Sequence, residues 1–195
     1  MLNFTREMLA DIPCLVIQDD RFASRSLLLH YHGWTGHKGD AHAPDQTLVR
    51  AASAGFTVVA PDCVEHGERR TDAWFRAMFN GWAFICDAMD KTRQEAPALM
   101  DAALALPDVS EDRPQVAGVS MGGLIAQTVF AQDRRFVSLV SVIGRSSFYQ
   151  ADAWCRSAQV GTAADEWCAE NATQAHPERF VDRPVLFIDG GQDTD

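Results

Sequence analysis

The chain has 195 residues, 47% of them hydrophobic, which is enough for one domain with a full hydrophobic core. Its formal net charge of -10 argues against nucleic acid or an anionic membrane as a partner, because both would repel an acidic protein. No segment approaches the ~18 consecutive apolar residues of a membrane-spanning helix, and the N-terminal residues do not resemble a signal peptide. Five cysteines without a Cys-x-x-Cys pair indicate reduced thiols, so we expect a cytoplasmic protein.

The first third of the chain predicts four strands, at residues 2–9, 14–17, 25–31 and 56–60. Residues 10–13 between the first two indicate a hairpin connection. The apolar run at 27–29 is typical of a strand buried on both faces. A helix is predicted at 45–54, and it is expected to stop at Gly55, which suits a helix C-terminus.

Apolar residues at three- and four-residue intervals predict a long helix at residues 71–106. Pro97 is expected to kink or break it, which would give two helices. Three further strands are predicted at 115–117, 136–143 and 184–188, and a further helix at 124–132.

The alternation of strands and helices predicts an α/β fold with a doubly wound, mostly parallel sheet. We expect one domain over residues 1–195, with residues 146–173 as a cap-like insertion because they have no strand pattern. The aromatic residues of this insertion either line an acyl pocket or pack the insertion onto the domain. In such a sheet the ligand site lies outside the carboxyl ends of the strands.

One motif carries the chemistry, and it reads Gly118-Val119-Ser120-Met121-Gly122. An apolar strand precedes it and a helical segment follows it, which is the context of a nucleophile elbow. In an elbow the serine occupies a sharp turn, and the flanking glycines avoid collisions with the neighbouring strand and helix. The serine hydroxyl then stands at a helix N-terminus, where the helix dipole favours negative charge.

Together with the elbow, four other parts of the chain carry a resemblance to a known family. They are Ala10-Asp11-Ile12-Pro13, Tyr31-His32-Gly33-Trp34-Thr35, residues 55–62 with His66-Gly67, and Asp182-Arg183-Pro184-Val185-Leu186. With these motifs the chain resembles the α/β-hydrolases, and among them the small bacterial carboxylesterases of the YjfP type. The resemblance implies the α/β-hydrolase fold and hydrolysis of small carboxylic esters without a metal or other cofactor. It also implies that the domain is C-terminally incomplete and lacks the last strand and helix of the family.

The resemblance implies roles for particular residues as well. Ser120 would be the nucleophile and would carry the acyl group of an acyl-enzyme. The backbone amides of Trp34 and Met121 would form the oxyanion hole. His32 is expected to support its turn rather than to transfer protons. The glycines that these turns require would be Gly33, Gly118 and Gly122.

The acidic member of the family's catalytic triad follows the last strand in a His-Gly-x-x-Asp pattern. This chain has Asp189-Gly190-Gly191-Gln192-Asp193, with aspartate in place of the usual histidine. Asp193 therefore takes the place of the catalytic acid, and Asp195 is a weaker candidate.

The general base of an α/β-hydrolase is a histidine that follows the acid, but only Thr194 and Asp195 follow Asp193 here. Three interpretations stay open. The first is that these residues belong to a longer hydrolase. The second is that the base lies elsewhere, at His37, His42, His66 or His176, of which His66 lies in the best-placed loop. The third is a catalytically incomplete scaffold that binds a small acyl or aromatic ligand.

A metal-dependent hydrolase is a further alternative. His30 and His32 would share one face of a strand, and Asp62 with His66 could complete a metal site. The elbow would then have no role, so we expect no metal. The expected partner is a small-molecule ester, and an unpaired edge strand would favour a homo-oligomer.

Overall fold

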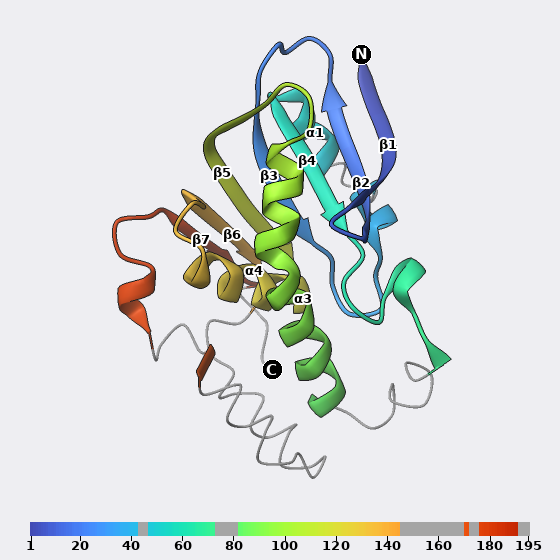
Figure 1. Cartoon of the computed structure of the whole chain (residues 1–195). Helices are drawn as coiled ribbons and strands as arrows, with labels where there is room; N and C mark the ends of the chain where they lie inside the picture. Colours follow the sequence, from blue (N-terminus) through green and yellow to red (C-terminus); the bar gives the residue numbers. More distant parts are fainter. Residues whose placement is uncertain (43–46, 73–81, 145–169, 172–175, 191–195) are drawn as a thin grey trace.

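The computed structural model describes residues 1–42, 47–72, 82–144, 170–171 and 176–190 (Figure 1). Its strands are β1 (Leu2–Leu9), β2 (Ile12–Asp19), β3 (Arg25–Tyr31), β4 (Phe56–Pro61), β5 (Val109–Val119), β6 (Ser138–Val142) and β7 (Val185–Ile188). Its α-helices are α1 (Thr47–Ser53), α3 (Trp82–Leu104) and α4 (Met121–Gln132). Its short 3-10 helices are η1 (Lys38–His42), η2 (Gly67–Arg69) and η5 (Pro177–Arg179).

The seven strands form one sheet in the order β1-β2-β4-β3-β5-β6-β7. The β1–β2 and β2–β4 pairs are antiparallel, and the other four pairs are parallel. The predicted mostly parallel sheet is therefore confirmed. Because parallel strands end at the same edge, the segments that follow β3, β4 and β5 meet there.

Helices cover both faces of this sheet (Figure 1). Successive residues of a strand point to opposite faces, and β2 shows this clearly. Cys14 and Val16 belong to the larger core under α3 and α4, whereas Leu15 and Ile17 pack with α1 on the other face. The continuous apolar pattern of β2 thus follows from burial on both faces.

Helix α3 runs without a break through Pro97, so the predicted division into two helices is wrong. A proline inside a helix costs about 3 kcal/mol. The same stretch buries Leu99 and Met100 almost completely in the larger core. Burial of two such side chains contributes roughly 3–6 kcal/mol, so tertiary packing offsets the cost of the proline.

Several boundaries also differ from the sequence prediction. The hairpin turn consists of only Ala10 and Asp11, with φ values of 50° and 62°, as in tight turns between paired strands. Strand β5 begins at Val109, well before the predicted start, because Val109 and Ser110 also pair with β3, before a shift of register that spans its charged residues. Strand β3 alternates between buried and half-buried residues, so its burial is complete on one face only.

Strand β7 is the last strand of the described sheet and pairs only with β6 there. Its residues Leu186, Phe187 and Ile188 are exposed by 53%, 39% and 46%. Since neighbouring strand residues face opposite sides, apolar surface is open on both faces of this edge. Such an edge can pair with another strand, and the homo-oligomer stays a prediction.

Candidate functional site

The motif around Ser120 forms the predicted sequence of strand, tight turn and helix. Strand β5 ends at Val119, helix α4 begins at Met121, and Ser120 lies between them with φ 53° and ψ -121°. The amide of Ser120 donates a hydrogen bond to the carbonyl oxygen of Val142 at 2.8 Å, and its carbonyl oxygen accepts one from the amide of Leu124 at 3.2 Å. Backbone contacts on both sides therefore hold a strained conformation that costs a non-glycine residue about 1–3 kcal/mol.

Two glycines allow the close approach that this turn requires. A methyl group on Gly118 would collide with the carbonyl oxygen of Gly122. A methyl group on Gly122 would collide with the carbonyl oxygen of Tyr31, at the end of β3. The elbow and the end of β3 thus touch through backbone atoms, and any larger residue would separate them.

The turn that follows β3 lies against the serine. A methyl group on Gly33 would stand 3.5 Å from the Cβ of Ser120. Trp34 is the next residue, and its half-buried side chain packs against the larger core. The structure thus brings Ser120 and the two predicted oxyanion-hole residues, Trp34 and Met121, into one region.

The electrostatic setting of Ser120 favours a negative charge. Its hydroxyl has no hydrogen-bond partner among the described residues. Met121 is the first residue of α4, and the first amides of an α-helix have no acceptor within the helix. The first turn of α4 contains no acidic residue, so the positive end of its dipole is not neutralised there.

His32 connects the two loops beside the elbow. Its Nε2 accepts a hydrogen bond from the amide of Cys63 at 3.1 Å, and its Nδ1 donates one to the carbonyl oxygen of Gly33 at 2.8 Å. Burial lowers the pKa of His32, which keeps the ring neutral. Both ring nitrogens are therefore occupied, and the ring supports the turn rather than offering a nitrogen for proton transfer.

His66 packs against the side chain of Trp34, a predicted oxyanion-hole residue. Its ring lies 4.7 Å from the ring of Trp34 and 5.2 Å from that of His32. Its Nδ1 donates to the carbonyl oxygen of Val64 at 2.8 Å, whereas its buried Nε2 has no partner within the described part of the chain. Burial lowers the pKa of His66 to about 4, so the ring is neutral near pH 7.

The remaining candidate residues lie elsewhere or outside the described residues. His37 is exposed and lies 3.6 Å from Asp40, and His176 lies 3.4 Å from Glu178. No described histidine side chain hydrogen-bonds to Ser120. The side chain of His42, residues Asp193 and Asp195, and all of the predicted cap at 146–173 except residues 170–171 are outside the described part.

A buried ion pair that the sequence analysis did not find supports the same loops. Asp62 accepts hydrogen bonds from Lys38 Nζ at 2.6 Å, from the amide of Lys38 at 2.7 Å and from the amide of Glu68 at 3.0 Å. The carboxylate of Glu68 also binds the ammonium of Lys38. The only signal in the sequence was the position of Asp62 directly after a buried strand, which suggested a metal ligand instead.

The geometry is unfavourable for the metal-site alternative. The carboxylate of Asp62 is engaged by Lys38, and both nitrogens of His32 are engaged by backbone groups. Over the described ranges, no three His, Cys, Asp or Glu side chains are placed to hold a metal ion.

Comparison with known proteins agrees with this geometry. A family model described as "Alpha/beta hydrolase family" matches residues 27–193, which include most of β3, the later strands β4 to β7 and the elbow. The chain belongs to the alpha/beta hydrolase family. It is 28% identical over 210 residues to the esterase YjfP of Escherichia coli (strain K12), and this similarity covers 99% of the chain and 79% of that protein.

Solved structures share the fold of this hydrolase family member. The acetyl xylan esterase 1 of Thermoanaerobacterium sp. JW/SL YS485 superposes with a TM-score of 0.62 at 16% identity, over 94% of the chain and 74% of that structure. TT1662 from Thermus thermophilus superposes with a TM-score of 0.59 at 20% identity, over 98% of the chain and 90% of that structure. At these identities the similarity establishes the fold alone.

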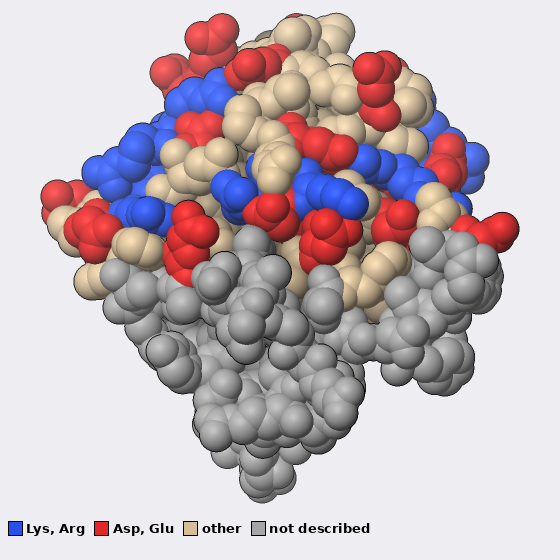
Figure 2. Space-filling view, turned by 60° about the horizontal axis from the view of Figure 1, so that its bottom comes forward, with Lys and Arg blue, Asp and Glu red and all other residues tan. Residues whose placement is uncertain are grey.

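The surface of this hydrolase domain carries charges of both signs. On the face shown in Figure 2, acidic and basic side chains lie next to one another over the described residues. Ion pairs such as Arg69–Glu95 and Arg135–Asp133, each at 2.6 Å, join such neighbours. In the described part of the chain, no helix combines the length and the apolar character that crossing a membrane would require.

Proposed function

We propose that this protein is a serine hydrolase that cleaves small carboxylic esters through an acyl-enzyme on Ser120. The observation that carries the proposal is the strained backbone of Ser120 between β5 and α4, with the Gly33 turn so close that a methyl group on Gly33 would stand 3.5 Å from the Cβ of Ser120. Strain of this kind is typical of functional sites. The names of two similar proteins, an esterase and an acetyl xylan esterase, support an ester as the substrate class.

The proposed reaction has two halves. The hydroxyl oxygen of Ser120 attacks the ester carbonyl carbon while a base removes the hydroxyl proton. The backbone amides of Trp34 and Met121 stabilise the oxyanion of the tetrahedral intermediate. The intermediate then collapses, and the alcohol leaves with a proton. Water attacks the acyl-enzyme in the same way and releases the carboxylic acid.

The base is the open part of this proposal. Asp193 takes the place of the triad acid, and no histidine follows it in the 195 residues. Because Ser120 lacks a hydrogen bond to any described histidine side chain, a second candidate function remains: a scaffold that binds a small acyl or aromatic ligand without turning it over. Loss of the triad base would leave only the residual catalysis of the oxyanion hole.

The test is hydrolysis of p-nitrophenyl acetate by the wild type, by Ser120→Ala and by the matched control Ser110→Ala. If turnover depends on Ser120, the hydrolysis rate of Ser120→Ala should fall to the uncatalysed background. The rate of Ser110→Ala should equal that of the wild type. Labelling by a fluorophosphonate, located by mass spectrometry, reports the nucleophile separately. The absence of both turnover and labelling of Ser120 would favour the scaffold, and full activity of Ser120→Ala would remove Ser120 from the mechanism.

A further inference from the structure

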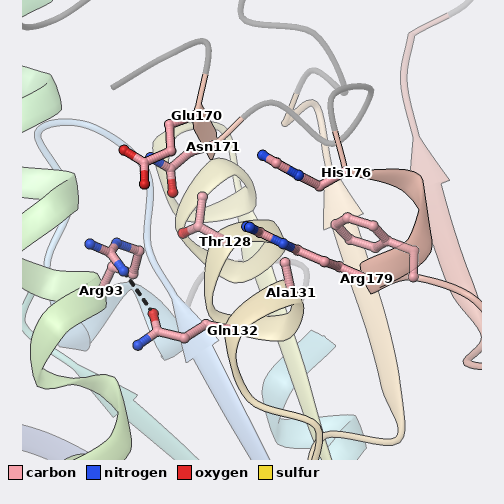
Figure 3. A pocket seen from close by; sticks show the side chains of 9 residues that line it. Arg93, Thr128, Ala131, Gln132, Glu170, Asn171, His176 and Arg179 are labelled. Carbon is pink, nitrogen blue, oxygen red and sulfur yellow. Dashed lines mark hydrogen bonds between the residues drawn. The ribbon is translucent and has the colours of Figure 1, made fainter. Parts of the chain in front are cut away.

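A hollow of about 390 Å³ lies between α3, α4 and η5, and Ser120 is not among the residues that line it (Figure 3). The lining residues are Arg93, Thr128, Ala131, Gln132, Glu170, Asn171, His176, Arg179 and Phe180. Most of them are polar or charged. Ligand pockets span roughly 300–1,000 Å³, so this one suits a small and polar molecule.

One wall of the hollow presents a cation. The guanidinium of Arg179 points into the hollow in Figure 3, with the ring of His176 above it. Within the described residues, the two terminal nitrogens of Arg179 have no acceptor, and its Nε lies 4.0 Å from the nearest carboxylate oxygen, on Glu178. A guanidinium with free terminal N–H groups can bind a carboxylate through two parallel hydrogen bonds.

This wall is fixed to the body of the protein. The carbonyl oxygen of Arg179 accepts hydrogen bonds from Arg134 Nη1 at 3.2 Å and from Arg183 Nη2. The ring of the adjacent Phe180 lies 5.7 Å from that of Phe130 in the core. The guanidinium of Arg183 in turn lies 3.7 Å above the ring of Phe130. The backbone position of Arg179 is therefore set before any ligand binds, which lowers part of the entropic cost of binding.

The opposite side of the hollow presents an anion. In Figure 3, Glu170 lies across the hollow from Arg179 and His176. Its carboxylate has no hydrogen bond or ion pair to any described residue. Arg93 on the same side does not neutralise it, because its Nε and Nη2 bind Asp90 Oδ1 at 3.0 Å and 2.6 Å, and its Nη1 binds Gln132 Oε1 at 2.9 Å.

We propose that this hollow binds a small zwitterion of the α-amino acid class. The ligand's carboxylate lies on the guanidinium of Arg179, and its ammonium lies on the carboxylate of Glu170. Thr128 donates its hydroxyl proton to the carbonyl oxygen of Ile125 at 2.8 Å, so its oxygen can only accept, which suits an ammonium donor. Glu170 repels ligands that carry only negative charge, such as inorganic phosphate. This proposal is independent of catalysis at Ser120.

The experiment is calorimetric titration of the whole chain with L-alanine and L-glutamine, and with acetate, methylammonium and inorganic phosphate as probes of one charge sign. We expect at least one amino acid to bind about tenfold or more tightly than each probe, because two charge-assisted contacts act together. No binding of either amino acid below ~10 mM would overturn the proposal. Equal or tighter binding of phosphate or acetate would also overturn it.

Two variants assign the charges. Arg179→Gln should weaken the binding of amino acid and acetate about tenfold and leave methylammonium binding unchanged. Glu170→Gln should weaken the binding of amino acid and methylammonium and leave acetate binding unchanged. A variant that fails to fold would lose the binding of every ligand. Loss of acetate binding in one variant and of methylammonium binding in the other therefore separates charge recognition from misfolding. Arg113→Gln, an exposed arginine on β5 outside the hollow, serves as the matched control and should bind like the wild type. Amino acid binding that is unchanged in both pocket variants would overturn the proposal.

Discussion

The side-chain ammonium of Lys38 lies 2.6 Å from a carboxylate oxygen of Asp62, and both side chains are almost fully buried. Lys38 follows β3 and Asp62 follows β4, so the pair joins the two loops beside the elbow. Burial by itself would raise the pKa of Asp62, but hydrogen bonds from Lys38 and from two backbone amides lower it below the ordinary value. The carboxylate is therefore ionised at neutral pH and complements the buried cation.

Replacing Asp62 by asparagine should destabilise the protein by about 3 kcal/mol, because the buried ammonium of Lys38 then keeps only the more exposed carboxylate of Glu68 as its counter-charge. The measurement is urea unfolding at pH 7, followed by tryptophan fluorescence. Asp87→Asn is the matched control, since Asp87 forms an ion pair with Lys91 at 2.7 Å in which both side chains are more than half exposed. We expect it to cost less than about 0.5 kcal/mol. Equal losses of unfolding free energy in the two variants would contradict a structural role for the buried ion pair.

The buried imidazole of His66 should make stability depend on pH. Burial lowers its pKa from 6.5 to about 4 in the folded protein, so between these pH values the unfolded chain binds a proton that the folded chain does not. Stability is therefore lost as the pH falls through this window, by ~2 kcal/mol between pH 7.5 and pH 5.

Unfolding of the wild type and of His66→Asn at these two pH values tests this prediction. Asparagine keeps an N–H donor for the carbonyl oxygen of Val64 but does not titrate. The variant should lose distinctly less stability on acidification, while the contribution of His32, whose pKa is also lowered by burial, remains in both proteins. The same pH dependence in both would show that His66 does not cause it.

The backbone strain at Ser120 predicts an unusual order of stability among its variants. At φ 53° and ψ -121° glycine is less strained than alanine, so Ser120→Gly should be more stable than Ser120→Ala by about 1 kcal/mol. The same pair of substitutions at Ser110 on β5 should give the reverse order, because glycine weakens an ordinary strand by about 0.5–1 kcal/mol. Thermal and urea unfolding of the four variants measure these differences in stability. If the alanine variant is the more stable one at both positions, the result would argue against strain at Ser120.

Two glycines near Ser120 should respond differently to alanine. At Gly33 the added methyl group would stand 3.5 Å from the Cβ of Ser120, in ordinary contact, so Gly33→Ala should fold but hinder access to the hydroxyl. Any esterase activity should fall about tenfold or more, because small displacements at a reacting centre are costly. At Gly122 the methyl group would collide with backbone, so Gly122→Ala should lose more than about 3 kcal/mol of stability. Unfolding followed by circular dichroism measures the stability of both variants, and hydrolysis rates measure their activity. Equal losses of stability in the two variants would contradict this prediction.

Much of the fold followed from local patterns. The strand limits of 2–9 and 25–31 agree with β1 and β3, because turn residues bound those apolar runs sharply. The break at Pro97 was wrong, because burial of Leu99 and Met100 stabilises the helix beyond what its local sequence indicates. The first half of β5 was missed because its charged residues lack strand alternation.

By itself, the sequence determined the family, the mostly parallel sheet, and the elbow with its flanking glycines, because these depend on residues close together along the chain. Only the tertiary structure decided which groups surround the elbow. Lys38 and Asp62 are 24 residues apart, and Cys63 lies 31 residues from His32, so no local pattern could pair them. Their contacts exist because parallel strands end at one edge of the sheet and bring distant loops together there. Burial then sets the charge states, and it turns two histidines that resemble metal ligands into neutral supports of the loops.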